Sequence, residues 1–280
     1  MVQRSGLGAF IMAKRKKEVE SPVKEVKKET KKTSPSSKRK AVDTEDWVLR
    51  HADELVSRLG LEFLKLSAEE YVSLLTKIVD TVRGESATID IDTVVRRIKR
   101  NVDKIYPMLA ATLLELRTSL DEEQLEFVVN NIGEAVLAYA PRLYSEARKL
   151  GREDLIEKLR NTWRQYWVLK RYPILPVTCP YCNFNSLMPD LSCAICGAIV
   201  SENELKSFLN FKALLEEFAL KEPIENVKKA LSFGYVYVNS LGIKVPGEHR
   251  DVLDIEVLLT SKDKEILIDK LKQREAQHGN

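Results

Sequence analysis

The chain has 280 residues, of which 44% are hydrophobic and 31% charged, a composition ordinary for a soluble globular protein. This length suits one large domain or two smaller ones. No run approaches the roughly 18 apolar residues of a membrane span, which excludes a helical membrane protein. The opening residues 1–13 are too short and too weakly apolar for a secretory signal. We therefore expect a cytoplasmic protein.

The charge is unevenly distributed along the chain. Residues 1–40 contain thirteen Lys or Arg and four Glu, so their net charge is +9. The whole chain has a net charge of +3, so residues 41–280 have a net charge of −6. Residues 1–42 have too little apolar surface to offset the entropy of ordering, so we expect a disordered basic tail. A basic tail serves either polyanion binding or solubility. Its candidate nucleic-acid-binding residues are Lys14, Arg15, Lys16, Lys17, Lys38, Arg39 and Lys40.

Two further compositional features concern the origin of the chain. Lys, Glu and Arg are abundant while Gln is scarce, a pattern typical of thermophiles. The stretch that begins at Met12 has the character of a natural start, which leaves open whether residues 1–11 are native. N-terminal sequencing of native protein decides this second point.

Helical periodicity dominates residues 43–172 and predicts a bundle-like domain of six or seven helices with short loops. The first helix is expected to end at Gly60, and Ser67 with Glu70 forms a capping box for the second. The later expected start and stop signals are Gly84, Asp92 as a cap, Pro107 as a first helical position, a capping box at Ser119 and Glu122, Pro141 as another start, and Gly151. The last and most aromatic helix spans residues 152–171.

Residues 173–200 change character, because two prolines, alternating apolar residues and all four cysteines of the chain fall there. Residues 201–280 follow as a small α+β segment. Ser201 and Glu204 form a third capping box, and the helix it begins runs through Phe218 and stops before Pro223. Residues 233–239 and 252–260 have β-rich composition and predict a hairpin, and Thr260 or Ser261 caps a final helix. The fold class expected is mainly α.

The cysteines are spaced Cys-x2-Cys-x10-Cys-x2-Cys, at Cys179, Cys182, Cys193 and Cys196. Two residues between cysteines let both sulfurs of a tight turn converge on one ion. Asn183 and Gly197 follow the two pairs, and both residue types tolerate a left-handed backbone. The segment resembles zinc ribbons with rubredoxin-type knuckles over about 25 residues, which implies one structural Zn²⁺ and a local fold. Iron uses the same ligands, so the metal stays open.

The cysteine segment, residues 173–200, has an unusual surface for a nucleic-acid-binding ribbon. From Val177 to Val200 there is no Lys or Arg. Four thiolates around a divalent ion are themselves net negative, so contact with phosphate is disfavoured. Its apolar residues form either a surface for a protein partner or packing contacts with neighbouring helices. These residues are Phe184, Leu187, Met188 and Leu191.

The aromatic helix offers a second nucleic-acid candidate, since Arg160, Arg164 and Arg171 share helical spacing with Trp163 and Trp167. Such a face either holds phosphates while its rings stack on unpaired bases, or it has core tryptophans and solvated arginines. We favour core. A further cluster is either a solvated helix face or a binding surface, and it consists of Arg96, Arg97, Lys99, Arg100 and Lys104.

No phosphate-binding loop, dinucleotide fingerprint or His-Glu-x-x-His motif occurs, and the cysteines are committed to metal. An enzyme is therefore the least favoured class. The leading hypothesis is a non-enzymatic zinc-binding adaptor in nucleic-acid metabolism, linked to transcription, replication or the ribosome. Its tail would meet nucleic acid and its ribbon a protein partner. The alternatives are a protein–protein scaffold with no nucleic-acid role and an enzyme with a structural zinc.

Overall fold

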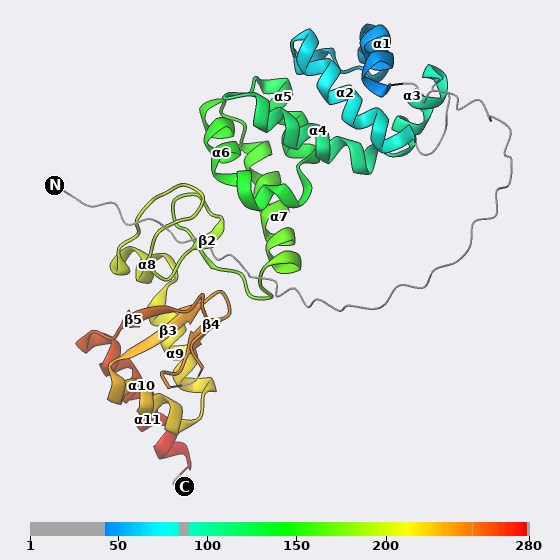
Figure 1. The fold of residues 1–280 in the computed structure, drawn as a ribbon. Coiled ribbons are helices and arrows are strands. Elements are labelled where there is room, and N and C mark those ends of the chain that lie inside the picture. Colours follow the sequence, from blue (N-terminus) through cyan, green and yellow to red (C-terminus); the bar gives the residue numbers. More distant parts are fainter. Residues whose placement is uncertain (1–42, 84–89, 248, 279–280) are drawn as a thin grey trace, which may run out of the picture. The chain divides into compact units, whose positions relative to one another are not determined.

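The computed structural model describes residues 43–83, 90–247 and 249–278. The expected basic tail, residues 1–42 with all its candidate binding residues, lies outside this range, as does the stop expected at Gly84. The first part of the described chain is entirely helical (Figure 1). Its elements are α1 (Thr44–Leu59), the short 3₁₀ helix η1 (Glu62–Leu64), α2 (Ala68–Arg83), α3 (Ile91–Arg100), α4 (Val102–Leu116), α5 (Glu122–Asn131), η2 (Gly133–Ala135), α6 (Val136–Lys149) and α7 (Glu153–Lys170).

The second part mixes short strands and helices. Its elements are β1 (Val177–Thr178), β2 (Asn185–Leu187), α8 (Glu202–Phe208), α9 (Phe211–Lys221), α10 (Ile224–Phe233), β3 (Tyr235–Asn239), β4 (Gly242–Lys244), β5 (Ile255–Leu258) and α11 (Ser261–His278). Strands β1 and β2 pair antiparallel, and a second antiparallel sheet has the order β4-β3-β5. The expectation of a mainly helical fold with a small β component is confirmed.

Several helix ends are set by the residues that the sequence indicated. Gly60 ends α1 in the left-handed region with φ of 65°. The backbone N–H of Ser67 donates to Glu70 and that of Glu70 to the Ser67 hydroxyl, which completes the capping box. Ser201 and Glu204 exchange the same pair of hydrogen bonds. Thr260 caps α11 by accepting from the N–H of Asp263. Each of these bonds satisfies a backbone donor that a helix start leaves free.

Two predicted caps are wrong by about one turn or less. The cap of α3 is Asp90, whose side chain accepts from the N–H of Thr93, and Asp92 lies within the helix. The capping box of α5 consists of Asp121 and Gln124 instead of Ser119 and Glu122. In both places a second acceptor stands two residues away in the sequence, and the side chain that caps is the aspartate that accepts from the N–H three residues after it.

Both prolines expected at helix starts lie in the second turn of a helix, Pro107 in α4 and Pro141 in α6. A proline there removes one intrahelical hydrogen bond, but the preceding turn can still form. The chain breaks earlier than predicted, at Asn101, where the side-chain amide donates to the carbonyl oxygen of Arg97. That bond satisfies an acceptor at the end of α3, and α4 then begins at Val102.

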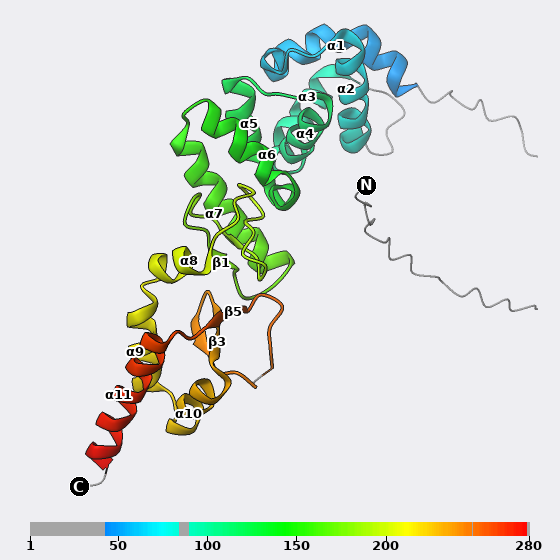
Figure 2. The same ribbon diagram turned by 90° about the vertical axis from the view of Figure 1, so that its left-hand side faces the viewer.

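Three elements of the second part differ from expectation. The single helix expected through Phe218 is interrupted at Asn210, which adopts the left-handed region with φ of 50° and separates α8 from α9. Helix α10 was not predicted, and the Gly/Pro connection contains β4, so the expected hairpin is a three-stranded sheet. Helices α9, α10 and α11 cover one face of this sheet in both ribbon views (Figures 1 and 2).

The buried apolar residues form two cores. The first contains the apolar faces of α1 to α7 and also the cysteines, Phe184 and Ile195 of the cysteine segment. The second contains α8 to α11, the inward faces of β3 and β5, and Val177, Leu187 and Val200 of that segment. The cysteine segment therefore contributes side chains to both cores. Residues 41–280 cluster as one unit, and the boundaries proposed at 172/173 and 200/201 stay predictions.

A buried carboxylate holds the turn region of the second sheet together. The Asp254 side chain is fully buried. It accepts from the Asn239 amide at 2.9 Å, from the Lys244 ammonium at 2.9 Å and from the Asp251 N–H at 2.7 Å. Burial acts to raise the pKa of Asp254, but these three donors outweigh it, and the pKa lies below its ordinary value.

We expect Asp254→Ala to destabilise the chain by about 2–4 kcal/mol, because it leaves the Asn239 and Asp251 donors without a partner. A depressed carboxyl pKa stabilises the fold above the unfolded value of about 3.9 and loses this effect as pH falls through the folded value. The wild type should therefore lose more stability than Asp254→Asn below about pH 4. Urea unfolding measures both effects. Glu256→Gln, which changes an exposed neighbour on β5, is the control. Equal losses of stability in Asp254→Ala and Glu256→Gln would contradict the assignment.

Candidate metal centre

The four cysteine sulfurs converge on one point. They come from two turns, Cys179 with Cys182 and Cys193 with Cys196, and all lie within 4.8 Å of one another. The Cys182 and Cys193 sulfurs are 3.6 Å apart, and those of Cys179 and Cys196 are 3.9 Å apart. Sulfurs at about 2.3 Å from a tetrahedral ion stand about 3.8 Å from one another. Two of the sulfur–sulfur distances match this value, and the cluster is compatible with binding one metal ion.

The backbone of each turn explains this convergence. Asn183 has φ of 59° and its N–H donates to the Cys179 carbonyl oxygen at 2.9 Å. Gly197 has φ of 71° and its N–H donates to the Cys193 carbonyl oxygen at 3.0 Å. The left-handed residue directly after each pair turns the chain back over the sulfurs, as the sequence indicated. The two turns are therefore local copies of one another.

The surroundings of the sulfurs are buried and prepared for thiolates. The N–H groups of Ile195 and Cys196 both lie 3.4 Å from the Cys193 sulfur, and the Ser186 hydroxyl lies 3.1 Å from it. Ser186 is fully buried, and no feature of the sequence pointed to it. Amide and hydroxyl hydrogens directed at a sulfur stabilise its charged form.

The protonation of the cluster couples to any cation it binds. Hydrogen bonding with Cys182, and then with Ser186 and the backbone, lowers the pKa of the Cys193 thiol to about 4. Burial raises the pKa of the Cys179 thiol to about 11, and the hydrogen bond to Cys193 raises that of Cys182. A cation that binds all four sulfurs as thiolates must displace the protons of Cys179 and Cys182, so its affinity falls as pH falls.

Helix α7 is attached to the cysteine segment through polar bonds. The Trp163 indole N–H donates to the Asn185 carbonyl oxygen at 3.0 Å. The Arg160 guanidinium donates to the Cys182 carbonyl oxygen at 3.1 Å, and that of Arg164 to the Asn185 side chain at 2.7 Å. Arg160 also lies 5.8 Å above the centre of the Phe184 ring. The helix read as a nucleic-acid candidate thus positions the cysteine segment.

The aromatic half of that nucleic-acid interpretation is wrong, because Trp163 and Trp167 are only 3% and 6% exposed and belong to the first core. The alternative that we favoured, core tryptophans, is confirmed. Arg160 is partly buried among the contacts just described. Arg164 and Arg171 are exposed, and Arg171 lies 5.7 Å from the Trp167 ring centre. Phosphate contact by these arginines stays a prediction.

The predicted partner surface of the cysteine segment also needs correction. Phe184 and Leu187 are completely buried, Phe184 in the first core and Leu187 in the second. Met188 and Leu191 are half-buried against these cores. The strand alternation of the segment points successive apolar side chains toward opposite cores, so little of this set reaches solvent. The packing alternative therefore describes Phe184 and Leu187.

No protein-family model, curated protein or solved structure matches this chain in the three comparisons made. Among the described helices none is long and apolar enough to cross a membrane.

If Trp167 is a core residue, Trp167→Ala should cost about 3–5 kcal/mol of stability, since it removes a large buried side chain and leaves a cavity. Thermal and chemical unfolding measure the loss. Leu169→Ala on the same helix, where the side chain is 66% exposed, should change stability by less than about 0.5 kcal/mol. Any nucleic-acid affinity should be unaltered in the folded Trp167→Ala protein, and a selective loss of affinity at full stability would contradict the core assignment.

Proposed function

We propose that this chain is a non-enzymatic zinc-binding adaptor of nucleic-acid metabolism. The single observation that carries the first half is the convergence of four sulfurs within 4.8 Å in a buried, closed arrangement. Four thiolates fill every position of a tetrahedral ion, so such a site organises structure and does not activate water. The soft donor set suits zinc, with iron as the competitor.

In this proposal the zinc forms a ribbon that fixes the two cores to the same short segment. Phe184 enters the first core a few residues after Cys182, while Leu187 enters the second core. An ion that locks the two turns would also lock the direction of these side chains. The zinc then stabilises the interior of the protein. A protein partner would contact the ribbon only at residues that stay exposed, such as Tyr181 and Ile199.

The nucleic-acid half of the proposal rests on a basic face. Arg96, Lys99, Arg100 and Lys104 are exposed on α3 and the start of α4, at helical spacing, while Val94, Val95 and Ile98 are buried on the opposite side. In the part of the chain that the structure describes, none of these four cations forms an ion pair with a carboxylate. Arg97 is different, because it donates to the carbonyl oxygens of Val82 and Arg83 at the end of α2.

Unpaired cations at this density favour the binding of a polyanion such as a nucleic acid, since each phosphate that they contact releases condensed counterions. The basic residues of the N-terminal segment would add to the same field. A protein–protein scaffold with no nucleic-acid role is the competing function, and it predicts no such binding.

The metal half of the proposal is tested by composition and by Cys193→Ser. We expect one zinc per chain in protein purified without added metal, and loss of zinc in the variant. Most helical circular dichroism should survive, because α1 to α6 bury apolar faces among themselves. Ser192→Ala, at the neighbouring position, should keep its zinc. Iron, or no metal, in the wild type would contradict the assignment.

The nucleic-acid half is tested by the salt dependence of binding. We expect affinity for single-stranded DNA, duplex DNA or RNA to fall steeply with salt. Arg96→Ala/Arg100→Ala should reduce the slope of log K against log salt by about two, one for each phosphate that the variant no longer binds. Lys262→Ala/Lys272→Ala, which removes the same charge from exposed positions on α11, is the matched control. Equal effects of the two double variants would exclude a specific α3 face, and absence of binding to all three nucleic acids would favour the scaffold.

A further inference from the structure

An open groove of about 540 Å³ lies along the whole length of α5, on the helical part of the chain. Its apolar floor consists of Phe63 and Phe127, whose ring centres are 4.9 Å apart. Tyr106 supports the floor from the side, with its ring centre 5.5 Å from that of Phe127. Both phenylalanines are only half-buried, so apolar surface remains open to a ligand.

Two side-chain amides hold the floor in place. Gln124, which is 4% exposed, donates from its side chain to the carbonyl oxygens of Phe63 and Leu64, at 3.3 and 2.9 Å. The Asn131 amide donates to the carbonyl oxygen of Phe127 at 2.7 Å. The two bonds from Gln124 fix η1 against α5, so the groove exists before any ligand arrives, and less ordering entropy opposes binding.

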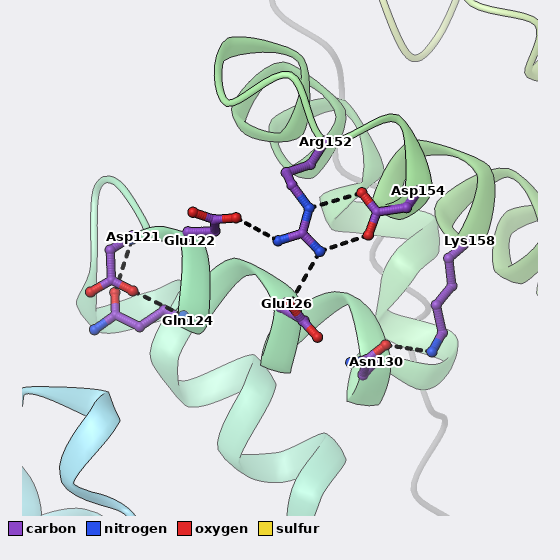
Figure 3. Close-up of polar contacts among 8 residues, drawn as sticks. All are labelled: Asp121, Glu122, Gln124, Glu126, Asn130, Arg152, Asp154 and Lys158. Carbon is purple, nitrogen blue, oxygen red and sulfur yellow. Dashed lines mark hydrogen bonds and ion pairs between the residues drawn. The ribbon is translucent and has the colours of Figure 1, made fainter.

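The rim of the groove is acidic and also held in place. Of the described residues that line it, three are Glu122, Glu123 and Glu126, and none is a cation. Figure 3 shows how Arg152 reaches this rim from the start of α7, donating to Glu122 at 2.8 Å and to Glu126 at 3.1 Å while it also pairs with Asp154. The hydrogen bonds from Arg152 lower the pKa of Asp154 to about 2.

Two cations lie beside the rim, Arg152 with its three ion pairs and Lys158, whose ammonium donates to the Asn130 side chain. The four carboxylates of Glu122, Glu123, Glu126 and Asp154 outnumber them, so the rim stays negative. Glu122 and Glu126 remain 65% and 52% exposed while they are bound to Arg152, so oxygen atoms of both stay accessible. Glu123 is exposed and forms no ion pair within 4 Å in the described chain, although its charge acts on the nearby Lys65, which is paired with Asp121. Arg152 therefore orients the carboxylates without neutralising them, which is an arrangement suited to a ligand with several positive charges.

We propose that this groove docks a basic peptide segment of a partner protein, with one large apolar side chain on Phe63 and Phe127 and flanking Lys or Arg on the glutamates. Charge complementarity selects a cationic partner, since a nucleic acid or an acidic peptide would be repelled by the rim. The aromatic floor selects a segment with an apolar anchor, and the ring faces also favour cations. The surface is separate from the basic face of α3, so one chain would hold two partners of opposite charge.

The test uses the full chain and three short labelled peptides. The first combines Lys and Arg with one Leu and one Phe, the second replaces these anchors by Ser, and the third replaces the cations by Glu. Fluorescence anisotropy measures affinity, and NMR follows the side-chain amide signals of Asn130 and Asn131, which line the groove. We expect binding of the first peptide only, with shifts of both amide signals.

Glu123→Lys should weaken this binding by roughly tenfold or more, because it reverses a charge at the rim without breaking an ion pair. Glu225→Lys, at an exposed position on α10, makes the same change in net charge and should leave the affinity unaltered. Glu123→Gln is the milder variant if Glu123→Lys loses stability, and it should weaken binding in the same direction.

Four results would overturn the proposal. They are no shift of the Asn130 and Asn131 signals with the first peptide, equal affinity for the peptide without anchors, and equal weakening by Glu123→Lys and Glu225→Lys. The fourth is a concentration-dependent dimer that Glu123→Lys abolishes, which would make a second copy of this chain the occupant.

Discussion

The organisation of the described chain depends on one constraint, the convergence of four sulfurs from two short turns. Each turn is closed by a residue with positive φ, and the amides inside it are directed at sulfur. A segment this small buries little apolar surface of its own and cannot fix its shape by packing alone. Once its shape is fixed, alternate side chains become anchors, Phe184 in one core and Leu187 in the other. The arrangement of both cores around the segment follows from that alternation.

The helix beside the cysteines illustrates how one sequence pattern supports two physical roles. Arginines interleaved with tryptophans suit a nucleic-acid surface as well as a packing helix, because a guanidinium can meet a phosphate or a carbonyl oxygen. Here the carbonyl oxygen of Cys182 and the side chain of Asn185 take the donors of Arg160 and Arg164. The arginines of this helix therefore serve packing, because their hydrogen bonds hold the cysteine segment to α7.

Features that depend on neighbouring residues could be predicted from the sequence, and features that depend on distant ones could not. The cysteine set and the boxes at Ser67 and Ser201 belong to the first kind. Where two acceptors stood close together, as at Asp90 and Asp92, sequence alone could not choose, because both side chains can accept from the N–H groups of the first turn and both starts bury the same face with Val94 and Ile98. Packing of Phe184 was one of two expectations, and its contacts could not be predicted, because they require α6 and α7 to be in place, with Tyr144 at a ring distance of 5.6 Å. Helix α10 was missed because its short apolar pattern lies between a proline and a β-rich run.

The way α8 meets the second sheet has a consequence for the behaviour of the protein in solution. Strand β5 is at an edge of its sheet. At Leu258 its backbone is hydrogen-bonded to α8, because the Leu258 N–H donates to Glu202 and the Lys206 ammonium donates to the Leu258 carbonyl oxygen. Helix α8 begins two residues after Val200, the last residue of the cysteine segment. An open edge strand is a template for pairing with other chains. Disturbance of the sulfur cluster would therefore free this edge, and the damaged protein would aggregate before its helices unfold.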